Sequence, residues 1–496
     1  MDRVDHLLAG QVATRPDALA LTDCGGARMT WAELDAASDA ARDLLEQHGV
    51  QAGDRVMILA ENCAAVIAML YACWKADAIA VPVNARQTAA EVSRVLDHAK
   101  PVVVIMSSAI SADAAAHAAR MDAEKCTGLF GEMHFARAHT SKPDPDRRIA
   151  VLLYTTGTTG EPKGVMLSHG NLVFGGSASA NLRNMGPADL VYGVLPVTHV
   201  FGLASIVTAA AYAGAAIRLE ARFSVEKLYE ALREGVTLLS AVPQMHALLM
   251  QYTAAQGYAT LGSDKLRYVS SGAAPLDPAW KRKAEQFYGV ALQNGYGMTE
   301  TAAGVSITDN MMGSDDISTG PPLPGVELRI DETTQGGGDG AGEVLVRGPH
   351  VMLGYYRNPI ETAKVLGADG WLRTGDLGRL DVAGNLHILG RTKELIIHGG
   401  FNVYPPEVEA ALNDHPHVIQ SAVIGRMRDS DEEVLAFVQI AEGDTVSVSD
   451  LRAFVRERLA GYKRPGQIIL ATILPAAPTG KILKHRLLER FGDQLD

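Results

Sequence analysis

Residues 154–164 read Tyr154-Thr155-Thr156-Gly157-Thr158-Thr159-Gly160-Glu161-Pro162-Lys163-Gly164, and they directly follow an apolar run that begins at Ile149. Glycines let backbone N–H groups approach a phosphate closely, threonine hydroxyls donate further hydrogen bonds, and a lysine adds a compact positive charge. A strand that leads into such a loop predicts a polyphosphate site. A plain glycine-rich turn is the alternative, but such turns seldom combine four threonines with a lysine. A Walker loop is excluded because Gly164, and not Ser or Thr, follows Lys163.

The bulk composition indicates a globular protein with more than one domain. At 496 residues the chain is longer than the roughly 250–300 residues at which a single core stops growing. The formal net charge of -12 and the absence of a Lys/Arg run argue against nucleic acid as a partner. The apolar runs are shorter than the ~20 residues of a membrane span, and no secretory signal begins the chain. We therefore expect a cytoplasmic location without integral membrane association.

Two further features carry less information. The four cysteines have no zinc-type spacing and are expected to be reduced and mostly buried, namely Cys24, Cys63, Cys73 and Cys126. No periodicity indicates an oligomeric state.

Amphipathic helices alternate with short apolar runs in the first third of the chain, which predicts an α/β fold. The capping-box pattern at Thr30 and Glu33 predicts a helix that ends near Gly49. Strands are expected at 55–60, 80–83 and 101–106, with a helix over 63–75. The segment 107–138 yields no prediction. The glycine-rich residues 333–342 predict a hairpin connection between strands at 326–330 and 343–347.

The pattern of apolar and polar residues changes after Arg391 and predicts a small α+β domain. Its expected elements are a helix over 406–412, strands over 419–424 and 434–440, a helix over 449–459 and a strand over 467–474. The predicted architecture is therefore a large N-terminal domain, 1–390, of mostly parallel sheets with flanking helices. A hinge joins it to a small C-terminal domain, 391–496.

Other motifs follow the loop in order along the chain. They are Leu195–Leu203 around His199, Ser270–Pro275, Asn294–Glu300, Trp371–Leu377, Gly390–Glu394 and Pro478–Ile482. Together with the loop they resemble the motifs of the adenylate-forming superfamily, which includes acyl-CoA synthetases, aryl-CoA ligases, luciferases and peptide-synthetase adenylation domains. The resemblance extends from Thr30 to Lys481. It implies an enzyme that uses ATP to activate a carboxylic acid as an acyl-adenylate.

The resemblance assigns a nucleotide site to residues of several motifs: Thr155, Thr156, Gly157, Thr158, Thr159, Gly160, Lys163, Gly272, Ala273, Ala274, Asn294, Gly295, Tyr296, Gly297, Asp376 and Arg391. Tyr296 would offer an aromatic face to adenine. Asp376 would accept hydrogen bonds from both ribose hydroxyls, and Arg391 would approach the same ribose. Considered alone, Tyr296 is equally well explained as a core residue. The less favoured alternative for Asp376 is a turn residue after Gly375.

The resemblance also implies catalytic residues. Thr299 would donate to the α-phosphate, and Glu300 would supply an oxygen ligand for Mg²⁺. Lys481 would be the catalytic lysine that holds the acid against the α-phosphate, and His199 would border the carboxylate and acyl pocket. The alternatives are a packed histidine, a helix N-terminal charge at Glu300 and an exposed lysine.

A second set of residues concerns the acceptor thiol. Lys393 matches the hinge position of the family, about which the small domain rotates. Gly399 and Gly400 match the segment that borders the pantetheine arm of coenzyme A, and Tyr462 and Arg464 match a segment near its nucleotide end. The implied cofactors are therefore ATP, Mg²⁺ and coenzyme A.

The resemblance leads to an AMP-forming acid:CoA ligase. An amino-acid substrate is disfavoured because residues 197–199 contain no aspartate for an ammonium group. The pocket positions within the motifs are small or apolar and include no cation, which predicts an aromatic or short- to medium-chain aliphatic monocarboxylic acid. A dicarboxylate such as malonate is disfavoured unless an arginine from elsewhere in the fold reaches the pocket. The alternatives are an inactive nucleotide-binding scaffold, a light-emitting oxygenase, or an enzyme with an acceptor other than coenzyme A.

Overall fold

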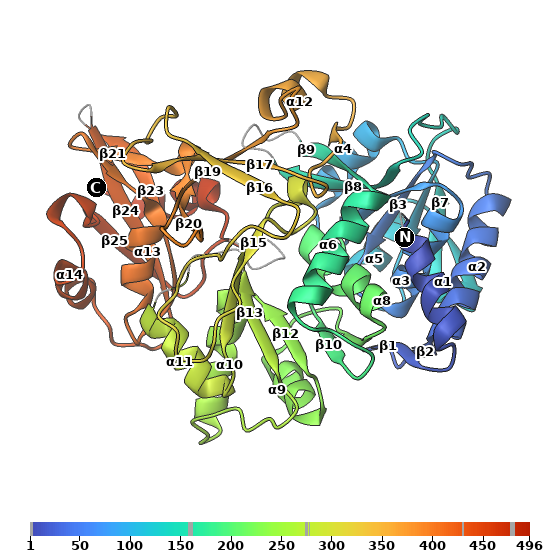
Figure 1. Cartoon of the computed structure of the whole chain (residues 1–496), viewed down its shortest axis with the longest axis horizontal. Helices are drawn as coiled ribbons and strands as arrows, with labels where there is room; N and C mark the ends of the chain where they lie inside the picture. The colour runs from blue at the N-terminus through green and yellow to red at the C-terminus, as the bar shows by residue number, and fades with distance from the viewer. Residues whose placement is uncertain (1–2, 157–161, 273–275, 277, 429–430, 477–481) are drawn as a thin grey trace.

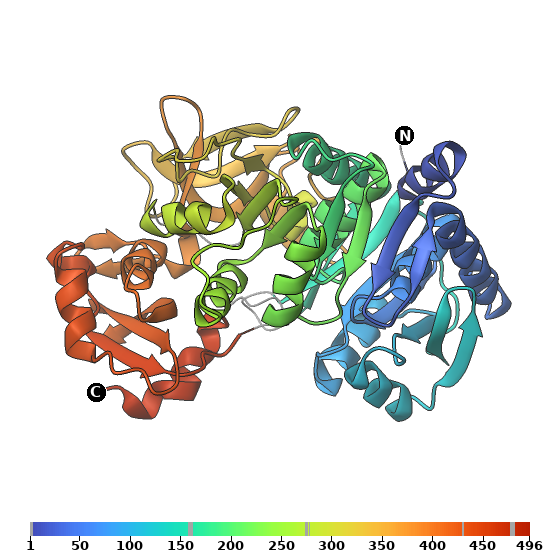
Figure 2. The ribbon, with the colours of Figure 1, turned by 90° about the horizontal axis from the view of Figure 1, so that it is seen from below.

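The chain forms two large mixed sheets, a smaller antiparallel sheet and a C-terminal unit at one end of the molecule (Figures 1 and 2). The computed structural model describes residues 3–156, 162–272, 276, 278–428, 431–476 and 482–496. The expected α/β class with a smaller second unit is present. The sheets are mixed because antiparallel strands pair at their edges.

The first large sheet has parallel strands in its middle and an antiparallel pair at each edge. Its strands, in spatial order, are β15 (Ser306–Ile307), β14 (Leu292–Tyr296), β13 (Tyr268–Gly272), β12 (Leu238–Ala241), β10 (Leu190–Gly193), β11 (Ala216–Leu219), β1 (Leu19–Asp23) and β2 (Arg28–Thr30). Gly272 pairs with Gly295 across β13 and β14. Two of the predicted nucleotide motifs therefore leave the sheet side by side at its carboxyl edge, where open α/β sheets bind ligands.

The second large sheet carries the threonine-rich loop. Its strands, in spatial order, are β18 (Gly354–Tyr355), β9 (Pro162–Ser168), β8 (Ile149–Thr156), β4 (Ile79–Asn84), β3 (Arg55–Ala60), β5 (Val103–Met106), β7 (Gly131–Arg137) and β6 (Glu124–Gly128). Strands β8 and β9 are antiparallel, with Thr155 opposite Lys163. The predicted strand over 55–60 is β3. The segment without a prediction forms a helix and the β6–β7 hairpin at this sheet's edge.

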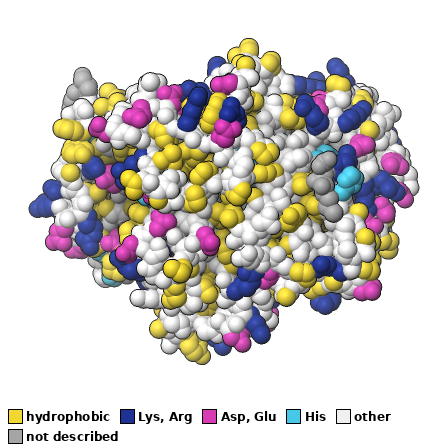
Figure 3. Space-filling model, in the orientation of Figure 1, with side chains coloured by type: hydrophobic (Ala, Val, Ile, Leu, Met, Phe, Trp, Pro, Cys, Tyr) yellow, Lys and Arg dark blue, Asp and Glu magenta, His cyan; other side chains and the backbone are white. Residues whose placement is uncertain are grey.

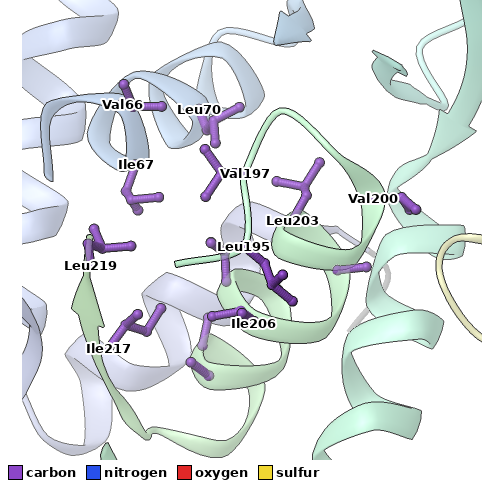
Figure 4. Packing of buried hydrophobic residues seen from close by; sticks show 14 of the residues in the cluster. Val66, Ile67, Leu70, Leu195, Val197, Val200, Leu203, Ile206, Ile217 and Leu219 are labelled. Atoms are coloured by element: carbon purple, nitrogen blue, oxygen red, sulfur yellow. The ribbon is translucent and has the colours of Figure 1, made fainter. Parts of the chain in front are cut away.

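Helix α3 (Ala64–Lys75) lies between the two large sheets and contacts β3 and β4 of one and β1 of the other. Every residue from Ala64 to Trp74 is buried, which explains why this stretch is apolar on all sides. Figure 4 shows Val66, Ile67 and Leu70 facing the buried residues that follow β10. Full burial of each large apolar side chain is worth about 1.5–3 kcal/mol, so this helix joins the sheets firmly.

The remaining helices cover the sheets or connect their strands. The α-helices are α1 (Val4–Thr14), α2 (Trp31–Gln47), α4 (Ala89–Ala99), α5 (Ala112–Arg120), α6 (His169–Leu182), α7 (Val200–Gly202), α8 (Ala209–Ala213), α9 (Val225–Glu234), α10 (Pro243–Ala255), α11 (Pro278–Tyr288) and α12 (Pro359–Val365). Helix α2 begins at the predicted capping box, in which Thr30 and Glu33 bond to each other's backbone N–H. A π-helical turn, η1 (Leu203–Thr208), continues α7.

A four-stranded antiparallel sheet connects the large sheets to the C-terminal unit. It consists of β16 (Glu327–Asp331), β17 (Ala341–Arg347), β19 (Leu372–Leu380) and β20 (Leu386–Arg391). The predicted hairpin over 333–342 joins β16 to β17. Strand β20 ends at Arg391, which is followed by the short helix η3 (Thr392–Glu394). The chain therefore leaves this sheet next to the predicted hinge residue Lys393.

The C-terminal unit has its own apolar core and two small sheets. Its elements are β21 (Ile396–His398), β22 (Phe401–Val403), α13 (Pro405–Asn413), β23 (Val418–Arg428), β24 (Asp431–Ile440), α14 (Val448–Arg456), η4 (Gly461–Lys463), β25 (Gln467–Ala471), η5 (Lys484–Arg486), α15 (Leu487–Phe491) and η6 (Gly492–Gln494). Strand β23 contacts α10, and α13 contacts β20. These contacts place the unit beside the carboxyl edge of the first sheet.

Figure 3 shows acidic and basic side chains interspersed over one face of the molecule. Within the described ranges, no helix combines the length and the apolar character that crossing a bilayer requires.

Two of the four cysteines are buried as expected, namely Cys63 and Cys73. Cys126 is half-buried and Cys24 is exposed, so these two depart from the expected burial.

Three buried histidines make the stability of the fold sensitive to acid. Burial lowers the pKa of His169, His246 and His350 to about 4. In the unfolded chain each titrates near its usual value of about 6.5. Between these two values the unfolded state binds more protons, so the free energy of unfolding falls as the pH falls, by up to about 1.4 kcal/mol per pH unit for each histidine.

His350 offers the cleanest test of this effect. Both of its ring nitrogens are buried without a hydrogen-bond partner among the described residues. We expect His350→Leu to keep the stability at pH 7 and to reduce the loss of stability between pH 6.5 and 4. Urea unfolding at several pH values would measure this, with the exposed His485→Gln as the control. An unchanged pH dependence would contradict the assignment.

Candidate active site

A cleft of about 2690 Å³ lies between the carboxyl edge of the first sheet and the C-terminal unit. Most of the described site residues that the sequence predicted line it: Thr155, Lys163, His199, Gly272, Asn294, Gly295, Tyr296, Gly297, Thr299, Glu300, Asp376, Arg391 and Lys393. They come from both large sheets, the antiparallel sheet and η3. The fold therefore brings together motifs that are separated by up to about half the chain.

Asp376 is the centre of a polar group at one side of the cleft. Its side chain is almost fully buried, and it accepts a hydrogen bond from the Tyr296 hydroxyl at 2.5 Å. Arg391 lies opposite it on β20 and places Nε 3.0 Å from its other oxygen. Burial, followed by the nearby Asp376 charge, raises the pKa of Tyr296 well above its usual value. The tyrosine therefore remains a donor, and the carboxylate is held in place for neighbouring hydroxyl groups.

Asn294 and Gly297 shape the part of the cleft next to Tyr296. The Asn294 amide nitrogen donates to Ser318 O at 2.9 Å, and its buried Oδ1 has no partner among the described residues. An exocyclic amino group, such as that of adenine, would satisfy this acceptor. A Cβ on Gly297 would lie 1.9 Å from Ala303 O, so only glycine fits there. The residues present are thus suited to a flat base against the backbone.

Glu300 is the candidate metal ligand. It follows Thr299 in the short helix η2 (Thr299–Thr301), and both side chains are largely buried. The Tyr355 hydroxyl donates to Glu300 Oε1 at 2.9 Å, and burial raises the pKa of Glu300. No group of three or more potential ligands gathers among the described residues. Such a site suits Mg²⁺, which usually takes one or two carboxylates and completes its shell with water and substrate phosphates.

Lys163 forms an ion pair that the sequence did not predict. Its Nζ lies 2.5 Å from Glu361 Oε2 and 5.1 Å from the centre of the Tyr355 ring. Glu361 belongs to α12 and also pairs with Lys364. Hydrogen bonds from these two lysines, first from Lys163, lower the pKa of Glu361 to about 2. The predicted phosphate-binding lysine is therefore already paired with an anion in the structure.

The pair predicts that Glu361 competes with the phosphates of ATP for Lys163. We expect Glu361→Gln to lower the KM for ATP about two- to fivefold, the range for a partly exposed ion pair. Steady-state ATP titrations would measure this. Glu327→Gln is the matched control, because Glu327 pairs with Arg347 on the antiparallel sheet. A higher KM in Glu361→Gln would mean that Glu361 positions Lys163 instead.

His199 lies in the wall of the cleft. It precedes α7, where its Nδ1 accepts a hydrogen bond from Phe201 N at 3.2 Å, and its side chain is exposed to the cleft. A Cβ on Gly272 would lie 3.2 Å from the Phe201 ring. The Phe201 ring therefore lies close to Gly272 in the wall of the cleft. The wall also includes Arg183, a cation outside the predicted motifs.

The residues predicted to meet coenzyme A do not line this cleft. Gly399 and Gly400 form the exposed turn between β21 and β22, with φ of +58° and +80°. Tyr462 stacks on Phe401 with ring centres 4.6 Å apart. Arg464 donates to the main-chain carbonyls of Leu459 and Arg456, at 2.9 Å in each case. The four predicted residues thus belong to the C-terminal unit, outside the walls of the cleft.

Several predicted residues are not placed by the structure. Gly157, Thr158, Thr159, Gly160, Ala273, Ala274 and Lys481 lie outside the described residues. Thr156 ends β8, opposite Pro162. The residues that flank the segment containing Lys481, Ala476 and Ile482, both line the cleft.

Comparison with known proteins identifies the family. The chain matches the family model of the AMP-binding enzyme over residues 8–356 and that of the AMP-binding enzyme C-terminal domain over residues 407–481. It belongs to the AMP-binding enzyme family. It is 34% identical over 482 residues to a feruloyl-CoA synthase of Amycolatopsis sp, covering 94% of this chain and 95% of the relative.

Two further similar proteins extend the comparison. The chain is 33% identical over 537 residues to a long-chain-fatty-acid–CoA ligase of Bacillus subtilis (strain 168), covering 98% of this chain and 94% of the ligase. A solved structure, the Bacillus subtilis o-succinylbenzoate coenzyme A synthetase with ATP and magnesium ion, superposes with a TM-score of 0.81. Its sequence identity is 29%, and the match covers 97% of this chain and 98% of that structure.

These matches confirm the adenylate-forming family and the enzyme class, an AMP-forming acid–thiol ligase. ATP, Mg²⁺ and coenzyme A, expected from the sequence, are confirmed as the cofactors of this class. The acids in the names of the relatives differ, and they include ferulate, long-chain fatty acids and succinylbenzoate. Family membership therefore leaves the acid open.

Proposed function

We propose that this ligase joins an aromatic or short- to medium-chain aliphatic acid to coenzyme A through an acyl-adenylate. The observation that carries the proposal is the group formed by Asp376, Tyr296 and Arg391 beside the buried free acceptor of Asn294. An acceptor for ribose hydroxyls, an aromatic face and an acceptor for an amino group are what an adenosine moiety requires. His199 and Phe201 line the same cleft, and we assign the acid to this part of it.

In the first step, the carboxylate of the acid attacks the α-phosphorus of ATP and pyrophosphate leaves. Asp376 and Arg391 fix the ribose, which aligns the α-phosphate with Thr299. Lys163 and the threonine-rich loop bind the departing pyrophosphate. Mg²⁺, when bound, would be held by Glu300 and would offset phosphate charge. Lys481 is assigned the task of holding the two anions together at the reacting centre.

In the second step, the thiol of coenzyme A attacks the acyl carbonyl and AMP leaves. We assign the described arrangement to the first step, because Ile482 lines the cleft whereas Gly399 and Gly400 do not. A rotation about Lys393 would bring the β21–β22 turn to the acid in the second step. The domains would then be 1–390 and 391–496, and Gly399, Gly400, Tyr462 and Arg464 would serve coenzyme A.

A panel of acids tests this proposal. Each acid is supplied with ATP, Mg²⁺ and coenzyme A, and both AMP release and loss of free thiol are measured. We expect one group of related acids to produce both signals in equal amounts. Tight ATP binding without pyrophosphate exchange for any acid would favour the inactive scaffold. Pyrophosphate exchange without thiol consumption would favour another acceptor.

A further inference from the structure

Arg183 is a buried cation in the wall of the cleft. It follows α6 directly, is 4% exposed and lines the cleft. Its Nη1 donates to Ser205 O at 2.6 Å, inside the π-helical turn η1. Its Nε is buried without a hydrogen-bond partner, and no carboxylate lies within 4 Å among the described residues. The side chain therefore presents a positive charge that the protein does not neutralise there.

The physical cost of this arrangement points to a ligand. A guanidinium stays charged even when buried, and an isolated buried charge is expensive unless an anion pairs with it. The Tyr268 ring, 5.6 Å from the guanidinium carbon, compensates only part of this cost. Two serine hydroxyls also line the cleft near Arg183. Ser179 Oγ donates a hydrogen bond to Ser205 Oγ at 3.2 Å. Ser205 thus links the cation to further donors suited to an anion.

The position of Arg183 along the pocket indicates the size of the ligand. Tyr268 and Gly272 begin and end β13 and face the same side of the sheet, because side chains alternate along a strand. At about 3.3 Å per residue, the four steps between them span about 13 Å. Gly272 lies beside Phe201, and Arg183 lies beside Tyr268. The cation therefore lies at the deep end of the acid pocket.

We propose that Arg183 binds an anionic group at the far end of the acid, and that the substrate is a dicarboxylic acid. Its two carboxylates would lie on the order of 10 Å apart, one at the reacting centre and one at Arg183. Arginine suits this task because its fork binds a carboxylate through two parallel hydrogen bonds. The proposal rests on the proposed ligase function. It replaces the expectation of a monocarboxylic acid, which depended on a pocket without a cation.

The test compares matched acids. Octanedioate and decanedioate are each paired with octanoate and decanoate, and kcat/KM is measured by AMP release with ATP and coenzyme A. We expect the wild-type enzyme to prefer the dicarboxylate of a pair roughly 10- to 100-fold, as for a charged hydrogen-bonded group. Arg183→Met should reverse this preference, because an apolar end then fits the monocarboxylate better. The preference of Arg183→Lys for the dicarboxylate should lie between those of the wild-type enzyme and Arg183→Met, because lysine keeps the charge but lacks the two parallel donors.

The outcomes separate this proposal from the proposed function. If the wild-type enzyme activates monocarboxylates as well as or better than dicarboxylates, the ligase assignment stands and the assignment of Arg183 falls. A preference for dicarboxylates that survives in Arg183→Met would also overturn it. If none of these four acids is activated, this inference fails, and the panel of acids described under the proposed function decides the ligase assignment separately. The wild-type comparison and Arg183→Lys decide the question even if Arg183→Met does not fold.

Discussion

Asp376→Asn should raise the KM for ATP about 100-fold or more, with little effect on the KM for the acid. In the native site the buried carboxylate accepts a hydrogen bond from Tyr296 and forms an ion pair with Arg391. An amide carries no charge and has only one acceptor oxygen, so two ribose hydroxyls would lose a charged acceptor. Hydrogen bonds to charged groups contribute about 1.5–3 kcal/mol each, which gives a combined effect of this size. ATP titration of pyrophosphate exchange would measure it.

Two controls make the Asp376 result specific. Tyr296→Phe removes one donor to Asp376 and keeps the aromatic ring, so the KM for ATP should rise less than in Asp376→Asn, because the charged acceptor for the ribose hydroxyls remains. Thermal unfolding without ATP should be little changed in both variants, because the side chain of Arg391 is 46% exposed and water can replace its partner. If Asp376→Asn unfolds readily while the KM for ATP changes less than twofold, Asp376 is a structural residue.

The sequence predicted those parts of the fold in which local patterns and packing agree. The capping box at Thr30 predicts the start of a helix, and the apolar run of β3 predicts a buried strand. Both elements are present. The segment 107–138 resisted prediction for a physical reason. Helix α5 is built mainly from alanine, and β6 lies at a sheet edge with mostly exposed side chains. Neither element carries the large apolar side chains from which type and boundaries are most readily inferred.

Some residues of the candidate site were predictable from the sequence, and others were not. Asp376, Tyr296 and Arg391 stand in motifs, so their gathering around the cleft followed from the resemblance. Glu361 and Arg183 stand in no motif that the sequence reasoning used. Glu361 meets Lys163 across 198 residues of sequence, and Arg183 follows an α-helix of low amphipathicity at a position typical of an exposed helix end. Only the packing of α6 against η1 turns Arg183 inward.

Lys481→Ala should reduce acyl-adenylate formation by ~10²–10³-fold, the usual cost of losing one charged donor at a reacting centre. It should leave thioester formation from supplied acyl-adenylate nearly unchanged. The reason is electrostatic. Two anions, the acid and the α-phosphate, must approach each other in the first step, whereas the acyl-adenylate and the thiol of the second step carry less opposing charge. Pyrophosphate exchange measures the first step, and thiol consumption from synthetic acyl-adenylate measures the second.

The role of Lys481 is decided by the ratio of the rates of adenylate formation and thioester formation, and not by either rate alone. Lys125→Ala is the matched control, since Lys125 lies on β6 and pairs with Glu132 at the edge of the second sheet. It should leave both steps unchanged. An equal loss of both steps in Lys481→Ala would assign the lysine to binding of the adenylate as such. A selective loss of the first step would mean that the C-terminal unit delivers a charge needed only while the two anions meet, which is the physical reason for a unit that moves between the steps.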